Sequence, residues 1–139
     1  MAKDIFHEVV KKALEQDGWT ITDDPYRLQV LDSAGYEIDF GAEKIVAATK
    51  DNRKIAVEVK SFLTISLAYE FHRVLGQYLN YRTFLGLKES DRMLYLAISQ
   101  NAYEEFFKQE STKLILETFE VKLLVFEPEN QTIESWIEK

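Results

Sequence analysis

The segment KIAVEVKSF, residues 54–62, alternates apolar and polar side chains at the period of a β-strand. Successive side chains of a strand point to opposite faces of the sheet. One face therefore carries three branched apolar side chains: Ile55, Val57 and Val59. The other face carries Glu58 and Lys60. A sheet that is open to water on one side would solvate both charges, whereas a sheet covered on both sides would bury them.

The rest of the chain predicts both helices and strands. Apolar residues at helix spacing predict helices over residues 6–14, 67–85 and 102–118. Strand-like runs occupy the segments between them: residues 19–22, 26–32, 36–40, 54–62, 92–99 and 121–128. The first four runs are separated by turn residues and predict a meander, in which 36–40 and 54–62 are neighbours. We expect an α/β fold with a mixed central sheet flanked by helices, in α/β/α layers.

Length and charge restrict the organisation and the partners of the chain. No repeat and no linker rich in proline, glycine or serine interrupts the sequence, so we expect one domain over residues 1–139. We expect no membrane contact and a cytoplasmic location, because no apolar run could span a bilayer and the start lacks a signal-peptide core. Seventeen basic and 24 acidic residues give a formal charge of -7. Contacts with nucleic acid are therefore expected to be local.

Acidic residues on two predicted strands suggest a metal site. Glu37 and Asp39 share one face of the strand 36–40, and Glu58 lies on the strand 54–62. Two carboxylates about 4 Å apart repel by roughly 4 kcal/mol at an effective dielectric constant near 20, and a divalent cation relieves that repulsion. The chain has no cysteine, and His7 and His72 are too few for an imidazole-based zinc site; neither is proposed as a ligand. Oxygen ligands favour Mg2+ or Mn2+.

The register of the expected hairpin matters for the identity of the first acidic ligand. With residues 51–52 at the tip of a plain hairpin, Glu58 lies opposite Ile45 and Lys60 lies opposite Glu43. Asp39 would then lie several residues beyond Glu43 along the strand.

Two solutions remain open at this point. A bulge or bend at Gly41 and Ala42 would bring Asp39 back toward Glu58, because glycine within a strand often marks such a feature. Otherwise Glu43 is the first acidic ligand. Both residues are kept as candidates, with Asp39 preferred because the apolar residues around it are typical of a strand end.

The helices supply further candidates. Arg73, Gln77 and Tyr81 share one helix face with Glu70, and this polar face is expected to turn toward the site or toward DNA. Glu8 lies opposite the apolar stripe of the first helix. It is either an ordinary solvent-facing glutamate or a group that reaches the metal through water.

Several segments resemble a known family. The pattern of Asp39 followed by Glu58 and Lys60 resembles the D…E-x-K signature of the PD-(D/E)xK nuclease superfamily, without the proline before the aspartate. The segment FHEVVKKALEQDGWTI is similar to the leading helix of such nucleases, and GQYLNYR is similar to the helix after their E-x-K. Together with EIDFGAEKIVAATK, EFHRVLGQYLNYR and the terminal SWIEK, they closely resemble the XisH-like family over nearly the whole chain. That family is named after a fdxN element excision controlling factor of cyanobacteria.

The resemblance implies a restriction-endonuclease-like fold and a link to programmed DNA excision with a small companion protein. It implies that Asp39 and Glu58 ligate the metal with the Val59 carbonyl. It also implies that Lys60 orients or deprotonates the attacking water and stabilises charge on the phosphate. The implied activity is metal-dependent endonuclease cleavage, a hydrolase reaction on a phosphodiester.

A second class of function stays open. Basic residues are scattered, with only residues 11–12 and 53–54 adjacent, so we expect DNA affinity to be shared with a companion protein or a symmetric homodimer. The alternative is a non-catalytic interaction subunit that keeps the nuclease fold and recruits or regulates a recombinase. The intact D…E-x-K set favours the enzyme, since a subunit freed from catalysis need not retain it.

Overall fold

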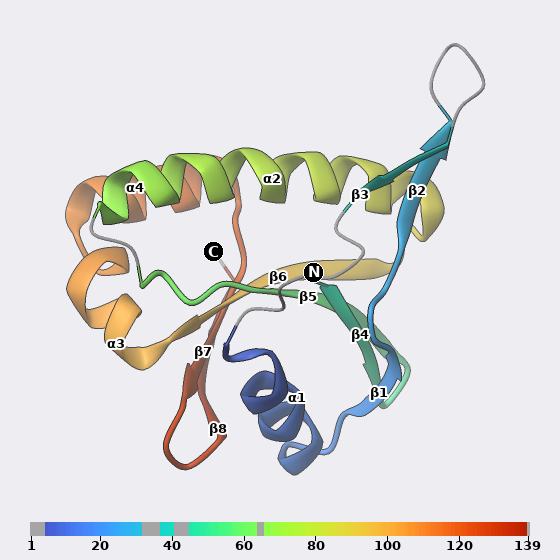
Figure 1. Cartoon of the computed structure of the whole chain (residues 1–139), viewed down its shortest axis with the longest axis horizontal. Helices are drawn as coiled ribbons and strands as arrows, with labels where there is room; N and C mark the ends of the chain where they lie inside the picture. The colour runs from blue at the N-terminus through green and yellow to red at the C-terminus, as the bar shows by residue number, and fades with distance from the viewer. Residues whose placement is uncertain (1–4, 32–36, 41–44, 64–65, 139) are drawn as a thin grey trace.

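The computed structural model describes residues 5–31, 37–40, 45–63 and 66–138 (Figure 1). Its helical segments are α1 (His7–Gln16), α2 (Leu67–Lys88), α3 (Gln100–Ala102), the π-helical η1 (Tyr103–Phe107) and α4 (Glu110–Thr118). Its strands are β1 (Thr20–Asp23), β2 (Leu28–Leu31), β3 (Glu37–Phe40), β4 (Ile45–Lys50), β5 (Arg53–Val59), β6 (Arg92–Ser99), β7 (Leu123–Glu127) and β8 (Thr132–Ile137).

A six-stranded mixed sheet forms the centre of the molecule, in the order β1-β4-β5-β6-β7-β8. β5, β6 and β7 are parallel to one another, and the other neighbouring pairs are antiparallel. The sheet is open rather than closed into a barrel. α2 provides the long crossover from β5 to β6 that a parallel pair requires.

Helices cover both faces of this sheet, as predicted. Figure 1 shows α1 and α2 on opposite sides of it. Val10 and Leu14 of α1 pack with Ile55, Val57 and Val59 of β5 in one apolar cluster. The second cluster packs α2 against the other face and includes Ala56, Phe71, Val74 and Tyr78. The α/β/α layering is confirmed, and it leaves β5 with no face toward water.

The predicted hairpin at residues 51–52 is confirmed. Asp51 and Asn52 have φ angles of 50° and 69°. Two residues with positive φ make the hairpin turn that matches the twist of the strands it joins, and Asn and Asp tolerate that conformation best after glycine. The resulting register places Ile45 opposite Glu58, as expected.

Two expectations about the elements were wrong, and one strand was not expected. β3 pairs with β2 in a separate two-stranded sheet, so the run 36–40 is not the neighbour of 54–62 in the central sheet. The neighbour is β4. The helix expected over residues 102–118 is divided into η1 and α4, and β8 was not predicted. None of the helices in the described ranges is long and apolar enough to cross a membrane, and the one-domain organisation stays a prediction.

Candidate active site at the end of strand β5

Glu58 and Lys60 lie at the carboxyl end of β5, on the face that α2 covers. The side chain alternation of the strand puts them opposite Val57 and Val59, which pack on the α1 side. Glu58 is fully buried and Lys60 is 6% exposed. The alternative of a solvated face is therefore wrong. Charged groups are rarely buried to this degree unless the fold compensates them or uses them.

Two tyrosines of α2 share the buried environment of Glu58. Burial and the Glu58 carboxylate raise the pKa of Tyr81 to about 12, against the opposing effect of Arg73. Burial is also the main cause that raises the pKa of Tyr78, and Glu58 contributes to it. The Tyr78 hydroxyl donates to the Leu94 carbonyl at 2.7 Å. Tyr81 is thus held as a neutral phenol beside a buried carboxylate.

The polar residues of α2 continue from Tyr81 toward the start of the helix. Arg73 and Glu70 form an ion pair with Nη2 and Oε2 2.6 Å apart. Glu70 is 9% exposed, whereas the Arg73 side chain is 43% exposed. The Oε1 atom of Gln77 is buried, and no group in the described part of the chain hydrogen-bonds to it. Arg73 and Glu58 both act on the pKa of Tyr81, in opposite directions. That this face turns toward the site or toward DNA stays a prediction.

The structure describes only part of the two candidates for the first acidic ligand, Asp39 and Glu43. Asp39 lies in β3, with its backbone opposite Gln29. Its side chain lies outside what the structure describes. Glu43 and the proposed bend at Gly41 and Ala42 also lie outside the described residues. The choice between Asp39 and Glu43 stays a prediction.

The backbone around Glu58 is fixed from both sides. Glu58 pairs with Ile45 of β4 and with Leu96 of β6. The ladder with β6 continues past Val59, because the Lys60 amide donates to the Ala97 carbonyl at 3.1 Å. Val59, whose carbonyl is a predicted metal ligand, ends the strand with its side chain in the core. The rigid ladder fixes the directions in which Glu58 and Lys60 point.

Glu8 lies instead with a polar cluster at the start of α1. Nε2 of His7 and Oδ1 of Asp24 are 2.7 Å apart, and the Lys11 ammonium lies 2.7 Å from Oδ2 of Asp24. Potential ligand atoms of His7, Glu8 and Asp24 lie within 4.8 Å of one another. Burial alone would raise the pKa of Asp24, but hydrogen bonds from Lys11 and His7 lower it. No sequence pattern marks this cluster, because its members come from a helix and a distant turn.

The Lys11 ammonium already supplies a cation to that cluster. It bonds Asp24 and lies 3.7 Å from Oε2 of Glu8. The cluster joins α1 to the chain after β1, and the helix lies on the sheet face opposite to Glu58. Glu8 is an exposed side chain there, at 62%, as its position on the helix predicted.

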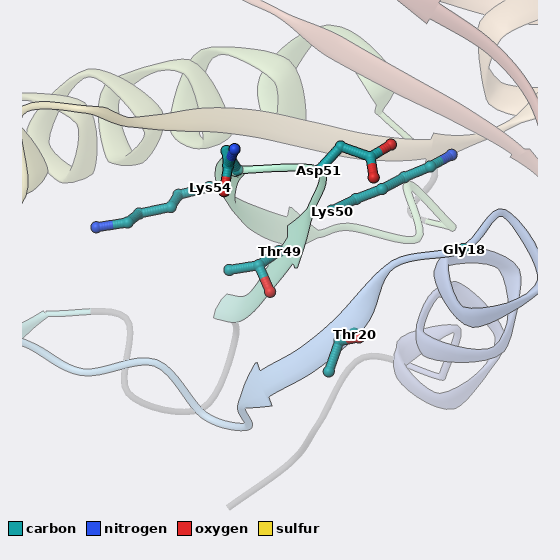
Figure 2. A pocket seen from close by; sticks show the side chains of 7 residues that line it. Gly18, Thr20, Thr49, Lys50, Asp51 and Lys54 are labelled. Carbon is teal, nitrogen blue, oxygen red and sulfur yellow. The ribbon is translucent and has the colours of Figure 1, made fainter.

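A pocket of about 510 Å³ lies at the other end of β5, beside the β4–β5 turn (Figure 2). Its walls are formed by Gly18, Thr20, Thr49, Lys50, Asp51, Asn52 and Lys54. Lys50 and Lys54 point away from each other (Figure 2). Lys50 bonds the Asp17 carbonyl, and Lys54 lies 3.3 Å from Asp91 and 3.5 Å from Glu89. The two ammonium groups therefore do not converge on one anion in this pocket.

The site at Glu58 offers the type of ligand atom that a hard divalent cation prefers. The buried Glu58 carboxylate supplies oxygen ligands, which Mg2+ and Mn2+ prefer. Lys60 adds a positive charge on the same sheet face. Either Asp39 or Glu43 would have to supply the second carboxylate.

The comparisons with known proteins agree over the whole length of the chain. The model of the family described as XisH protein matches residues 1–134. An XisH family protein from Nostoc punctiforme PCC 73102 is 41% identical, with a TM-score of 0.87, covering 97% of this chain and 100% of that one. A fdxN element excision controlling factor protein from Anabaena variabilis is 46% identical, with a TM-score of 0.85, covering 96% and 98%. Comparison with curated proteins finds no match.

Proposed function

This chain belongs to the XisH family, and from that premise we propose that it acts in programmed excision of a DNA element by metal-dependent hydrolysis of a phosphodiester. The link to excision rests on the similar protein from Anabaena variabilis, which is described as a fdxN element excision controlling factor. The observation that carries the chemistry is the burial of Glu58 and Lys60 on one face of β5. These are the glutamate and the lysine of the E-x-K pattern of the PD-(D/E)xK nucleases.

The proposed cofactor is Mg2+ or Mn2+. Glu58 would hold it with either Asp39 or Glu43 and with the Val59 carbonyl. When bound, such an ion polarises a phosphoryl oxygen and lowers the pKa of its water. Its ligands need a fixed position, and the paired backbone of β5 provides that for Glu58.

The protein's own groups have distinct roles in this proposal. The Lys60 ammonium, buried at the end of β5, stabilises the negative charge that develops on the phosphate, because a preorganised cation is most effective where water is excluded. It is also the group that orients the attacking water. Tyr81 stays protonated at neutral pH, so its hydroxyl can donate a hydrogen bond to an anionic oxygen. Arg73 lies at the exposed side of the site, where it can meet a phosphate.

The decisive experiment measures metal binding and DNA cleavage in parallel. Mn2+ is titrated calorimetrically into wild type, Glu58→Ala and Lys60→Ala, and each protein is then incubated with supercoiled plasmid. We expect the binding heat to vanish in Glu58→Ala and plasmid nicking to be lost in both variants. Glu15→Ala, an exposed carboxylate of α1 on the other face, is the matched control and should behave as wild type.

The alternative is a non-catalytic subunit that keeps this fold. It is favoured by the formal charge of -7 and by the ion pairs that engage Lys11, Lys50 and Lys54. Such a subunit would act through a companion protein, a recombinase or a second copy of the chain. A folded protein that neither binds Mn2+ nor nicks DNA, yet associates with a partner, would establish this alternative.

A further inference from the structure

A ridge of side chains runs along α2 from solvent down to the buried site. Tyr69, Arg73, Gln77 and Tyr81 follow one another at four-residue spacing, which places them in one row on the surface of a helix. Tyr69 is 70% exposed, the Arg73 side chain 43% and Tyr81 only 6%. The row spans about 18 Å at a rise of 1.5 Å per residue. It therefore joins open solvent to the environment of Glu58.

At the outer end of this ridge, large side chains are exposed to water, and the backbone that carries them is held in a defined conformation. Ser66 caps α2 by accepting a hydrogen bond from the Tyr69 amide, which fixes the first turn. Phe62 has a φ of 54°, an uncommon conformation for a bulky residue, and its ring packs 5.0 Å from the ring of Phe107. Leu63, the next residue, is 64% exposed. The segment after Lys60 is thus anchored through Phe62, with Leu63 and Tyr69 left outside.

The chemistry of the ridge matches single-stranded nucleic acid better than the other partners. Proteins bind single strands by stacking bases on exposed aromatic rings and by pairing cations with the backbone, and Tyr69 and Arg73 supply one of each. The Gln77 Oε1 atom is a buried acceptor that no described group satisfies, and such atoms are costly unless a ligand or water meets them. A base amino group is a suitable donor. A protein partner would be expected on an apolar patch, whereas this ridge becomes polar and ends at a carboxylate.

We propose that a single-stranded segment of DNA lies along Tyr69, Arg73 and Gln77, with a base stacked on Tyr69, and leads to the Glu58 site. The substrate class is then DNA with unpaired bases beside the scissile phosphate. A fully paired duplex offers no base face to Tyr69, because its bases are stacked on one another. This inference rests on the proposed function, since it assigns a substrate to the same site.

The test measures binding without cleavage. Fluorescence anisotropy of a labelled oligonucleotide, single-stranded or annealed to its complement, is followed without added metal for wild type, Tyr69→Ala and Tyr69→Trp. We expect wild type to prefer the single strand, Tyr69→Ala to bind it roughly 5- to 100-fold more weakly, and Tyr69→Trp to restore binding, because stacking needs only an aromatic ring. Leu87→Ala is the control, since Leu87 is 78% exposed on the same helix.

The outcomes separate this inference from the proposed function. Equal binding of single strand and duplex, or unchanged binding in Tyr69→Ala, overturns the inference even if wild type nicks plasmid. Absence of any DNA binding overturns it as well. A Tyr69→Ala variant that keeps oligonucleotide binding but loses a protein partner assigns the ridge to protein contact. If the protein binds single-stranded DNA through Tyr69 but does not nick plasmid, the binding of DNA along the ridge is supported. That result counts only against the proposed hydrolysis.

Discussion

Glu58 of β5 and Tyr81 of α2 occupy one buried site, in which burial and the Glu58 carboxylate raise the pKa of Tyr81 to about 12. A carboxylate beside a phenol favours the protonated phenol, because ionisation would place two negative charges together. Tyr81 therefore keeps its hydroxyl proton, and with it a hydrogen-bond donor, at neutral pH. It also makes the site a source of pH-dependent stability in alkali.

Tyr81→Phe should reduce the loss of stability at alkaline pH. A raised folded pKa means that the neutral phenol stabilises the fold fully below pH 10 and that this contribution is lost as the pH rises toward 12. Two pKa units correspond to about 3 kcal/mol. The free energy of unfolding, measured in urea across this range, should fall less steeply in Tyr81→Phe. Parallel curves for the two proteins would show that Tyr81 titrates normally.

Glu89→Gln should destabilise the protein at neutral pH and have little effect in acid. Hydrogen bonds from Arg92 lower the pKa of Glu89 to about 2, with a further hydrogen bond from Tyr26 and against the effect of burial. The ionised carboxylate therefore stabilises the fold above pH 4.5, and that contribution is lost as the pH falls toward 2. We expect a loss of about 1 to 3 kcal/mol at pH 7, because the side chain is partly solvated.

The Glu89 prediction is tested by comparing the variant with the wild type at two pH values. The free energy of unfolding in urea should differ clearly between Glu89→Gln and wild type at neutral pH. The difference should vanish as the pH approaches 2. A difference that persists in acid would mean that the Gln side chain disturbs packing around Tyr26 rather than removing a charge.

Lys60→Met should destabilise the protein more than the double variant Glu58→Gln, Lys60→Met. Removing the ammonium alone leaves a fully buried carboxylate with less compensation, at a cost of about 3 to 5 kcal/mol, whereas removing both charges avoids that penalty. Thermal and urea unfolding of the wild type, both single variants and the double variant complete the cycle. Additive effects would show that the two groups do not interact.

Glu70→Gln should tighten the binding of single-stranded DNA. Glu70 holds the Arg73 guanidinium at 2.6 Å, and its neutral replacement frees that cation for a phosphate. The pair is partly exposed, so the gain is small, up to about fivefold. The salt dependence of binding should become steeper in Glu70→Gln, because one more cation meets the backbone. Weaker binding in this variant would mean that Glu70 positions Arg73 for the DNA.

The faces of β5 and the turn before it could be predicted from sequence because both depend on local rules. A strand period of two assigns Glu58 to one side whatever its neighbours are. Asp51 and Asn52 favour a two-residue turn, which then sets the register with Ile45. The burial of Glu58 could be predicted because the sequence contains enough helical segments to cover both faces of the sheet.

Long-range pairing could not be predicted in this way. The run 36–40, which forms β3, and the segment of β4 both precede the hairpin, and alternation alone does not say which one pairs with β5. β8 could not be predicted, because TIESWI lacks a sustained apolar face and depends on pairing with β7. The bond between His7 and Asp24 joins a helix to a turn, and neither residue shows a pattern in its own segment.

β5 is paired with β4 and β6 along both edges and covered by helices on both faces. Amide protons in such a strand exchange with solvent only when a large part of the fold opens, so Glu58 should be among the slowest positions in hydrogen exchange. α2 has no strand pairing to restrain it and bears the residues that lead to Glu58. We therefore expect control of the proposed site to come from what approaches along α2, and not from any loosening of the strand that holds the carboxylate.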